Sequence, residues 1–289
     1  MTEPVTVDEL EPGDHACLTF SDVDERLDIV AAFVRDGLDR GDKVVCLTDA
    51  LEPAELSAEL SERGLPIEAS TCSGQFEATP SVSAYVVGGV FDPARVISGL
   101  RTRIDGALAK GYPGLRISAD MVWALRPVSG LEQLLTFEVQ FNELLASRPA
   151  TVVCQYDRVG FDAVSLAGAS AAHGRAVAAV TYHADAVLRI CRQHVPPGVR
   201  IAGELDYRGL DALTRALSEA VRLDNHLFLN LSQLSFIDVA AAGIVLQTAY
   251  GLGGGKLMTV VCQPVVGKVL RALGGDQLAA LKMIVRDVG

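Results

Sequence analysis

The sequence lacks several features that would settle its class at once. No stretch approaches eighteen uninterrupted apolar residues, and the N-terminus MTEPVTVDEL is acidic where a secretory signal would be basic and then apolar. The formal net charge is −11, and no cluster of Lys and Arg is interleaved with aromatic residues. We therefore expect a cytoplasmic protein that has no membrane segment and does not bind nucleic acid.

Phosphate-binding and cysteine-pair motifs are also missing. Nothing matches the phosphate-binding loop GxxxxGK[ST], and the six cysteines include no CxxC pair. The segment Thr19–Glu25, after the first predicted strand, carries three carboxylates where a triphosphate would need backbone N–H groups and a lysine. ATP hydrolysis is therefore disfavoured. We expect no cofactor, and thiols that are free and mostly buried.

The length and the amino-acid composition are those of an ordinary globular protein. A chain of 289 residues is long for one compact domain and sufficient for two, each with its own core. The composition is 49% hydrophobic and 21% charged, which leaves little room for extended disorder.

In the first half, short apolar strands alternate with helices. Lys43–Thr48 (KVVCLT) is a continuous apolar run, typical of a strand buried on both faces, and apolar residues recur at three and four between Asp22 and Arg40, with Ser21 as the expected cap. We expect further strands at 15–20, 83–87, 115–118 and 151–156, and further helices at 52–63, 92–110, 131–147 and 161–172. This order predicts βαβ units and a doubly wound parallel α/β sheet.

The second half centres on residues 227–243, LFLNLSQLSFIDVAAAG. Leu227–Leu231 is an apolar run of strand length that Asn230 interrupts with one polar group, and Asp238 stands where a helix N-cap belongs. Around this segment we expect a hairpin within 184–204, helices at 207–223 and 263–273, and a strand at 257–261.

This second half resembles the STAS domain of anti-sigma-factor antagonists. The resemblance lies in Asn-Leu-Ser, Phe236-Ile237-Asp238 and Gly243, with Gly203–Asp206 upstream, and it covers about the last hundred residues. It implies a partner-facing surface around Asp206, Asn230 and Asp238, although loop capping also explains the first two.

In that family the residue after the aspartate is a serine or threonine that a partner kinase phosphorylates. Here that residue is Val239, which has no hydroxyl to phosphorylate. The resemblance therefore implies either regulation by another route or constitutive binding of the partner.

The first half resembles the DcmR-type sensory domain called MEDS over about residues 10 to 180. The resemblance is carried by the order and spacing of these segments: His15-Ala-Cys17, Phe33–Leu38, Arg116–Trp123, Phe137-Glu138, Cys154–Asp157 and His173. It implies a degenerate RecA/KaiC-like domain without a phosphate loop that senses small molecules. We place the MEDS domain at 1–180 and the STAS domain at 181–289.

Two groups of residues in the first domain are candidate ligand contacts. His15 and Cys17 are two apart, so on a strand they share a face, where imidazole and thiolate bind zinc or haem iron. Two ligands are too few for a closed metal site, so we expect no metal there, and either a structural role or contact with an organic ligand. For His173, capping of a helix is the simpler interpretation.

The second group comes from the carboxyl ends of predicted strands, where doubly wound sheets hold ligands, and from a neighbouring predicted helix. It comprises Asp120, Trp123, Glu138, Tyr156 and Asp157. A crevice lined by these residues is one interpretation, and ordinary packing explains Trp123 equally well. Because no nucleophile with a positioned base is visible, we expect no enzymatic activity.

Together these observations predict a signalling protein whose sensory domain, responding to a small molecule, controls a STAS module that binds an anti-sigma factor or a related partner-switching protein. One alternative is a RecA-like ATPase with an unusual nucleotide loop, which ATP titration of Asp22 and Asp24 variants would reveal. The other is a STAS scaffold that assembles as a homo-oligomer, which sedimentation would reveal.

Overall fold

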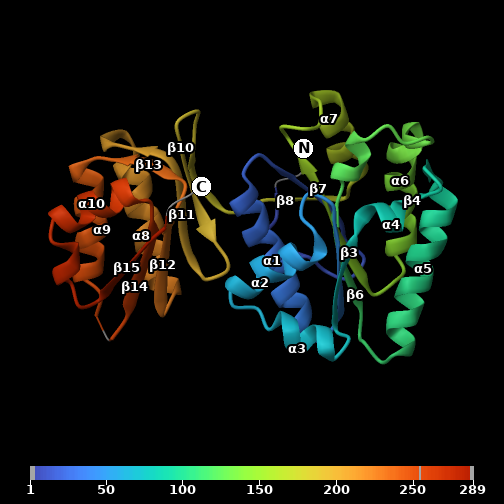
Figure 1. Ribbon diagram of the computed structural model, residues 1–289, viewed down its shortest axis with the longest axis horizontal. Helices are drawn as coiled ribbons and strands as arrows, with labels where there is room; N and C mark the ends of the chain where they lie inside the picture. Colours follow the sequence, from blue (N-terminus) through green and yellow to red (C-terminus); the bar gives the residue numbers. More distant parts are fainter. Residues whose placement is uncertain (1–3, 254, 287–289) are drawn as a thin grey trace. The chain divides into compact units, whose positions relative to one another are not determined.

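The computed structural model describes residues 4–253 and 255–286. The chain divides into two compact units, Met1–Ala178 and Ala179–Gly289, each with its own sheet and core (Figure 1). None of the helices in these described ranges combines the length and apolar character needed to cross a bilayer.

The first unit is built on a parallel sheet of six strands in the order β3-β2-β6-β7-β1-β8. The strands are β1 (His15–Phe20), β2 (Lys43–Thr48), β3 (Phe76–Pro80), β6 (Leu115–Asp120), β7 (Ala150–Asp157) and β8 (Arg175–Val177). A separate two-stranded ribbon pairs β4 (Val86–Val87) with β5 (Val90–Phe91). The predicted parallel α/β sheet is confirmed.

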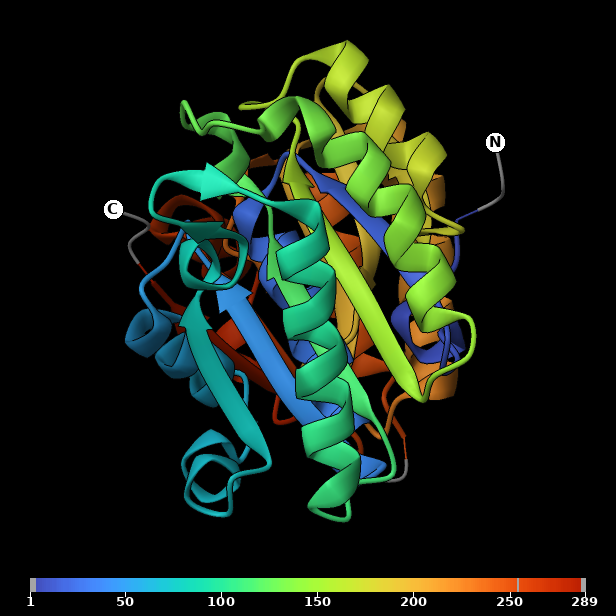
Figure 2. The same ribbon diagram turned by 90° about the vertical axis from the view of Figure 1, so that its right-hand side faces the viewer.

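Helices cover both faces of this sheet. They are α1 (Val23–Asp39), α2 (Pro53–Glu62), α3 (Ile67–Cys72), α4 (Ser81–Tyr85), α5 (Pro93–Ala109), α6 (Leu134–Leu145) and α7 (Ala163–Ala172). Figure 1 shows α1 and α2 on one face and α5 and α6 on the other, and Figure 2 shows α5 and α6 in front of the strands. The sheet is therefore doubly wound.

Local signals explain most of these elements, with two corrections. The cap of α1 is Asp22, whose carboxylate accepts the N–H of Glu25, rather than Ser21. The predicted strand at 83–87 is instead the short helix α4, which begins at Ser81 directly after Pro80, followed by the two residues of β4.

Strand alternation sorts the sheet's side chains onto its two faces. In the register of β1 and β7, Cys17 lies opposite Cys154 and Leu18 lies opposite Gln155. Cys17 and Cys154 belong to the core beneath α5 and α6, whereas Gln155 contacts Arg26 of α1 on the other side. Polar groups thus occur on both buried faces of one sheet.

The second unit has a mixed sheet in the order β15-β14-β12-β11-β10-β9, with β13 paired to β11. The strands are β9 (Thr181–Ala184), β10 (Leu188–Gln193), β11 (Gly198–Leu205), β12 (His226–Leu231), β13 (Leu234–Ile237), β14 (Leu257–Cys262) and β15 (Leu281–Val285). The helices are α8 (Leu210–Leu223), α9 (Val239–Tyr250) and α10 (Pro264–Ala272). As predicted, β10 and β11 form an antiparallel hairpin.

Gly203 interrupts β11 at the point where that strand leaves β12 and pairs with β13. Its φ is +96°, the left-handed region, and a β-carbon there would lie 1.9 Å from the carbonyl oxygen of Val187. The register shifts between Gly203 and Glu204, so the glycine marks a bulge. This bulge directs the end of β11 toward the N-terminus of α9.

Candidate functional site

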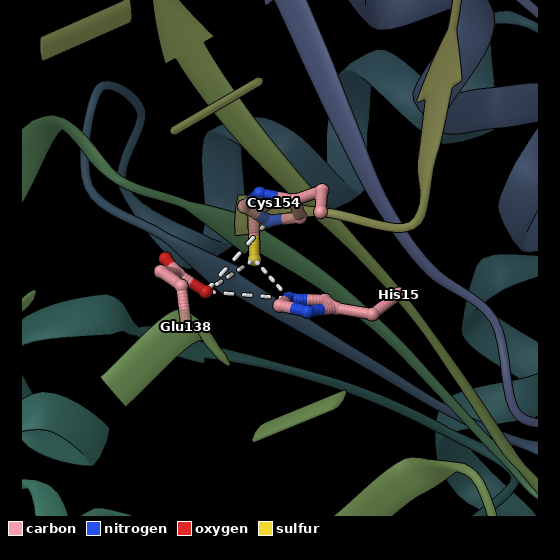
Figure 3. Close-up of side chains that lie close together, drawn as sticks. His15, Glu138 and Cys154 are labelled. Atoms are coloured by element: carbon pink, nitrogen blue, oxygen red, sulfur yellow. Dashed lines mark hydrogen bonds and ion pairs between the residues drawn. The ribbon is translucent and has the colours of Figure 1, made fainter. Parts of the chain in front are cut away.

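Four buried side chains in the first unit bring their donor atoms together. His15, Glu138, Cys154 and His173 each offer one nitrogen, oxygen or sulfur atom, and all four atoms lie within 4.8 Å of one another. Figure 3 shows His15, Glu138 and Cys154 pointing toward one another. We call these four residues the His-Cys-Glu cluster.

Three separate elements and the end of a fourth supply the cluster. His15 begins β1, Cys154 lies in the adjacent strand β7, and Glu138 lies on α6, which packs over both strands. His173 follows the last residue of α7. The strands alone place His15 and Cys154 on one face of the sheet, and the two helices complete the set.

The distances within the cluster are short. His15 Nε2 lies 3.3 Å from Cys154 Sγ and 3.3 Å from Glu138 Oε2. His173 Nε2 lies 3.7 Å from Glu138 Oε2, and Cys154 Sγ lies 4.0 Å from the same oxygen. The centroids of the two imidazole rings are 4.1 Å apart.

Neighbouring groups fix the outward-facing atoms of the cluster. His15 Nδ1 lies 3.0 Å from Asn142 Oδ1, and because Asn142 donates its own amide N–H to a backbone carbonyl, the histidine is the donor. His173 Nδ1 donates to the carbonyl of Ala169 at 2.7 Å. The Tyr156 hydroxyl donates to Glu138 Oε1 at 2.5 Å. Both histidines therefore direct Nε2 inward, and in a neutral ring this nitrogen carries a lone pair.

Burial sets the charges in the cluster. It lowers the pKa of His173 to about 4, so that ring is neutral near pH 7, and it raises the pKa of the Cys154 thiol and the Tyr156 hydroxyl well above their usual values. Burial also opposes ionisation of Glu138, whereas the hydrogen bond from the Tyr156 hydroxyl stabilises its carboxylate form and acts to lower its pKa.

Sequence reasoning found most of this cluster but missed one member. It singled out His15, Glu138 and His173 separately, and it paired His15 with Cys17. Cys17 does lie on the same face, with its pKa raised to about 12 by burial, but its sulfur is not one of the four convergent atoms. Cys154 takes that place. Its two-residue spacing from Tyr156 was the available signal.

Asp120 belongs to the opposite face of the sheet. Its carboxylate pairs with the Arg26 guanidinium at 2.7 Å, with both side chains buried, and accepts the backbone N–H groups of Asp49, Ala50 and Val122. The structure therefore separates Asp120 from Glu138 and gives it a structural role at the end of β6.

Trp123 and Asp157 also lie apart from the cluster. The Trp123 ring is fully buried, stacked on Tyr85 at 4.9 Å and packed against Phe91. The Asp157 carboxylate accepts the backbone N–H of Val159 in the turn after β7. Among the predicted residues of this group, only Glu138 and Tyr156 reach the His-Cys-Glu cluster.

In the second unit, a group of exposed residues surrounds the N-terminus of α9. Asp238 caps this helix by accepting the N–H of Ala241 at 2.7 Å, and Val239, its first residue, is 68% exposed. Tyr207 is 71% exposed and Phe236 is 48% exposed, and both lie at the carboxyl ends of the paired strands β11 and β13. We call Tyr207, Phe236, Asp238 and Val239 the cap surface.

The other two predicted partner residues have local roles as well. Asp206 accepts the backbone N–H of Arg208 and pairs with that residue's guanidinium at 2.9 Å. The Asn230 amide donates to Gln193 and its oxygen accepts from Ser232, so this side chain orders the loop after β12. Asp206 directly precedes Tyr207 of the cap surface in the chain, whereas Asn230 is a buried residue of β12.

The chain is an α/β protein of two units, of which the first holds a buried polar cluster and the second an exposed group of largely apolar side chains. Residues 14–174 match the family described as the MEthanogen/methylotroph, DcmR Sensory domain, and residues 192–287 match the STAS domain. The chain belongs to the MEDS family and carries a STAS domain after its MEDS domain.

Similarity to individual proteins is more distant. The transcriptional repressor DcmR of Methylorubrum extorquens is 26% identical over 163 residues, which are 55% of this chain and 58% of the repressor. The chain thus spans less than two thirds of that relative's length.

Two solved structures are similar in fold. A KaiC-like protein of Pyrococcus horikoshii has a TM-score of 0.47 at 13% identity, covering 70% of this chain and 88% of its own. The flagellar accessory protein FlaH of Methanocaldococcus jannaschii has a TM-score of 0.43 at 11% identity, covering 64% of this chain and 79% of its own.

Proposed function

We propose that the chain is a non-enzymatic regulator resembling anti-sigma-factor antagonists, and that its cap surface binds an anti-sigma factor or a related partner-switching protein. The observation that carries this proposal is the exposure of Val239 at the start of α9, beside Tyr207 and Phe236. Clustered exposed apolar side chains mark protein contact surfaces. The STAS match supports the same role.

Binding at the cap surface would not be switched by phosphate on its central residue. Val239 stands at the first helical position after the Asp238 cap, and its side chain carries no hydroxyl. A phosphate there would add about two negative charges to an apolar contact surface. Since that route is closed at Val239, we propose that the regulatory signal enters through the MEDS domain.

The MEDS domain would act by changing how strongly the STAS domain binds its partner. Such coupling between two sites typically amounts to about 1–3 kcal/mol, or roughly 5- to 150-fold in affinity. We propose that a small molecule supplies the signal, as the description of the family as a sensory domain suggests.

Two features favour a regulator over an enzyme. The Asp22 carboxylate occupies the N-terminus of α1, where a nucleotide phosphate would otherwise meet free N–H groups. The Cys154 thiol lies beside an imidazole, but burial raises its pKa, which opposes formation of the nucleophilic thiolate.

Calorimetric titration of the full-length chain with each candidate anti-sigma factor tests the proposal. The variant Val239→Asp places a charge on the cap surface, and we expect it to weaken binding at least tenfold. The matched control is Tyr250→Asp at the far end of the same helix, where Tyr250 is 82% exposed; its affinity should stay within twofold. Equal binding by both variants would contradict a role for the cap surface.

Incubation with a partner kinase and ATP tests the regulatory part. The natural chain should incorporate no phosphate at residue 239, whereas Val239→Ser should become a substrate. Mass spectrometry of the peptide spanning 234–250 reads this directly. A phosphate found on that peptide in the natural chain would contradict phosphate-independent binding.

A further inference from the structure

We propose that the His-Cys-Glu cluster is a binding site for one divalent late first-row metal ion, with Zn²⁺ the best fit. The four ligating atoms are His15 Nε2, His173 Nε2, Glu138 Oε2 and Cys154 Sγ. Two imidazoles, a thiolate and a carboxylate form a four-coordinate donor set of the kinds that Zn²⁺ takes in proteins.

The spacing of the four atoms fits tetrahedral coordination. Ordinary Zn–N, Zn–O and Zn–S bond lengths place the ligand atoms of a tetrahedron roughly 3.3–3.6 Å apart. The distances from His15 Nε2 to Glu138 Oε2 and to Cys154 Sγ are both 3.3 Å, and Glu138 Oε2 lies 3.7 Å from His173 Nε2 and 4.0 Å from Cys154 Sγ. Small side-chain shifts would complete the site.

The groups around the cluster are those that support metal ligands. A ligating histidine usually donates its other ring N–H to a carbonyl or carboxylate, which fixes the ring and leaves a lone pair for the metal. Asn142 accepts from His15 Nδ1 and the Ala169 carbonyl accepts from His173 Nδ1. The Tyr156 hydroxyl holds Glu138 Oε1 and leaves Oε2 for the ion.

Hydrogen bonds within the cluster do not satisfy all of its atoms. His173 Nε2 is fully buried and has no hydrogen-bond partner, although it points at Glu138 Oε2. When both rings carry their proton on Nδ1, the lone pairs of the two Nε2 atoms and of Glu138 Oε2 converge. The Cys154 S–H is then the single hydrogen-bond donor among the four atoms. A buried acceptor left without a donor is costly, and a cation would bind all three lone pairs at once.

Charge balance also favours a divalent ion. Glu138 as carboxylate and Cys154 as thiolate contribute two negative charges, and the two neutral imidazoles contribute none. A Zn²⁺ ion makes the sum zero in a site whose four residues are all buried. With four protein ligands the site would be closed, which fits metal retention or metal sensing rather than catalysis on a bound water.

Spectroscopy on the full-length chain provides the test. After dialysis against a chelator, the chain should bind one equivalent of Zn²⁺ or Co²⁺. The Co²⁺ form should show the absorption bands of a tetrahedral ion and a thiolate-to-cobalt charge-transfer band. Cys154→Ser should lose that band, and Cys17→Ser, the matched control on the same sheet face, should keep it. Asn142→Ala should keep the band but weaken binding roughly 10- to 100-fold.

X-ray absorption of the zinc-loaded natural chain covers the case in which a variant fails to fold. It should show one sulfur at about 2.3 Å and three nitrogen or oxygen ligands at about 2.0–2.2 Å. The proposal fails if the chain binds less than a tenth of an equivalent of either metal, if the spectrum contains no sulfur, or if Cys17→Ser rather than Cys154→Ser loses the band. Partner binding at the cap surface is measured separately, so either proposal can fail alone.

Discussion

Removing the positive charge of Arg26 should strongly destabilise the first unit. The guanidinium pairs with the Asp120 carboxylate at 2.7 Å, and its Nε donates to Gln155 Oε1 at 2.6 Å. The side chains of Arg26 and Asp120 are 3% and 0% exposed. The substitution Arg26→Met keeps the length of the aliphatic stem and leaves a buried carboxylate without its counter-ion.

The expected loss follows from what remains around Asp120. Removing one partner of a buried ion pair costs about 3–5 kcal/mol, because the other charge is left uncompensated. Three backbone N–H groups still donate to the carboxylate, which places the loss near the lower end, at about 3 kcal/mol. With a urea slope of about 2 kcal/mol per M, the midpoint should fall by roughly 1.5 M.

Trp123 makes this change measurable in the intact protein. It is the single tryptophan of the chain and is buried in the first unit, so its fluorescence during urea unfolding reports on that unit. The matched control is Arg103→Met, which removes a half-exposed pair with Glu77 at 3.4 Å and should cost below about 0.5 kcal/mol.

A double-mutant cycle separates the charge effect from lost packing. Arg26→Met combined with Asp120→Asn removes both charges, and the combined loss should be smaller than the sum of the single losses by about 2 kcal/mol. A midpoint shift below about 0.5 M for Arg26→Met, or strictly additive losses, would refute the argument that the pair neutralises a buried carboxylate.

Three further predictions concern the second unit. Gly203→Ala places a β-carbon at a residue with positive φ and against a backbone carbonyl. Hydrogen exchange of β11 should therefore show that the free energy of unfolding falls by at least about 2 kcal/mol. The control Gly243→Ala lies in open space on α9 and should raise the free energy of unfolding by about 0.5–1 kcal/mol. Asp238→Ala removes the cap of α9 and should cost about 1 kcal/mol in chemical denaturation, with Asp238→Asn close to the natural chain. Backbone hydrogen bonds, first from Val187, lower the pKa of Asp185 to about 2. Its contribution to stability is therefore present above the unfolded pKa near 4 and is lost as the pH falls toward 2, which an NMR titration and an Asp185→Asn variant would show.

The spacing of apolar residues predicted those helices and strands whose burial pattern can be seen from residues close together in the sequence. The continuous apolar run of β2 and the spaced apolar face of α1 are local signals, and both elements were predicted. The edge strand β15 and the four residues of β13 were not predicted. The side chains of β15 are only partly buried, and β13 is too short to show a periodic pattern. The structure of both strands therefore depends on the strands they pair with.

The candidate sites show the same limit. Asp238 and Val239 are adjacent in the chain, so these two members of the cap surface were predictable from order alone, whereas Tyr207 joins them only through the pairing of β11 with β13. The His-Cys-Glu cluster joins residues between 16 and 158 positions apart, and Cys154 reads as one more apolar member of its strand. Only the parallel pairing of β1 with β7, and the packing of α6 across them, brings its sulfur to His15.

Neighbouring positions of β7 carry unlike chemistry on opposite sides of the sheet: the thiol of Cys154 faces the imidazole of His15, and the amide of Gln155 faces the guanidinium of Arg26. A strand with apolar residues on both faces can tolerate a shift in its register with the neighbouring strand, because each apolar contact is replaced by another apolar contact. Here a slip by a single residue would send the amide among the imidazoles and the thiol toward the arginine. Natural insertions or deletions within this strand should therefore be rare, and length variation should collect in the turns that flank it.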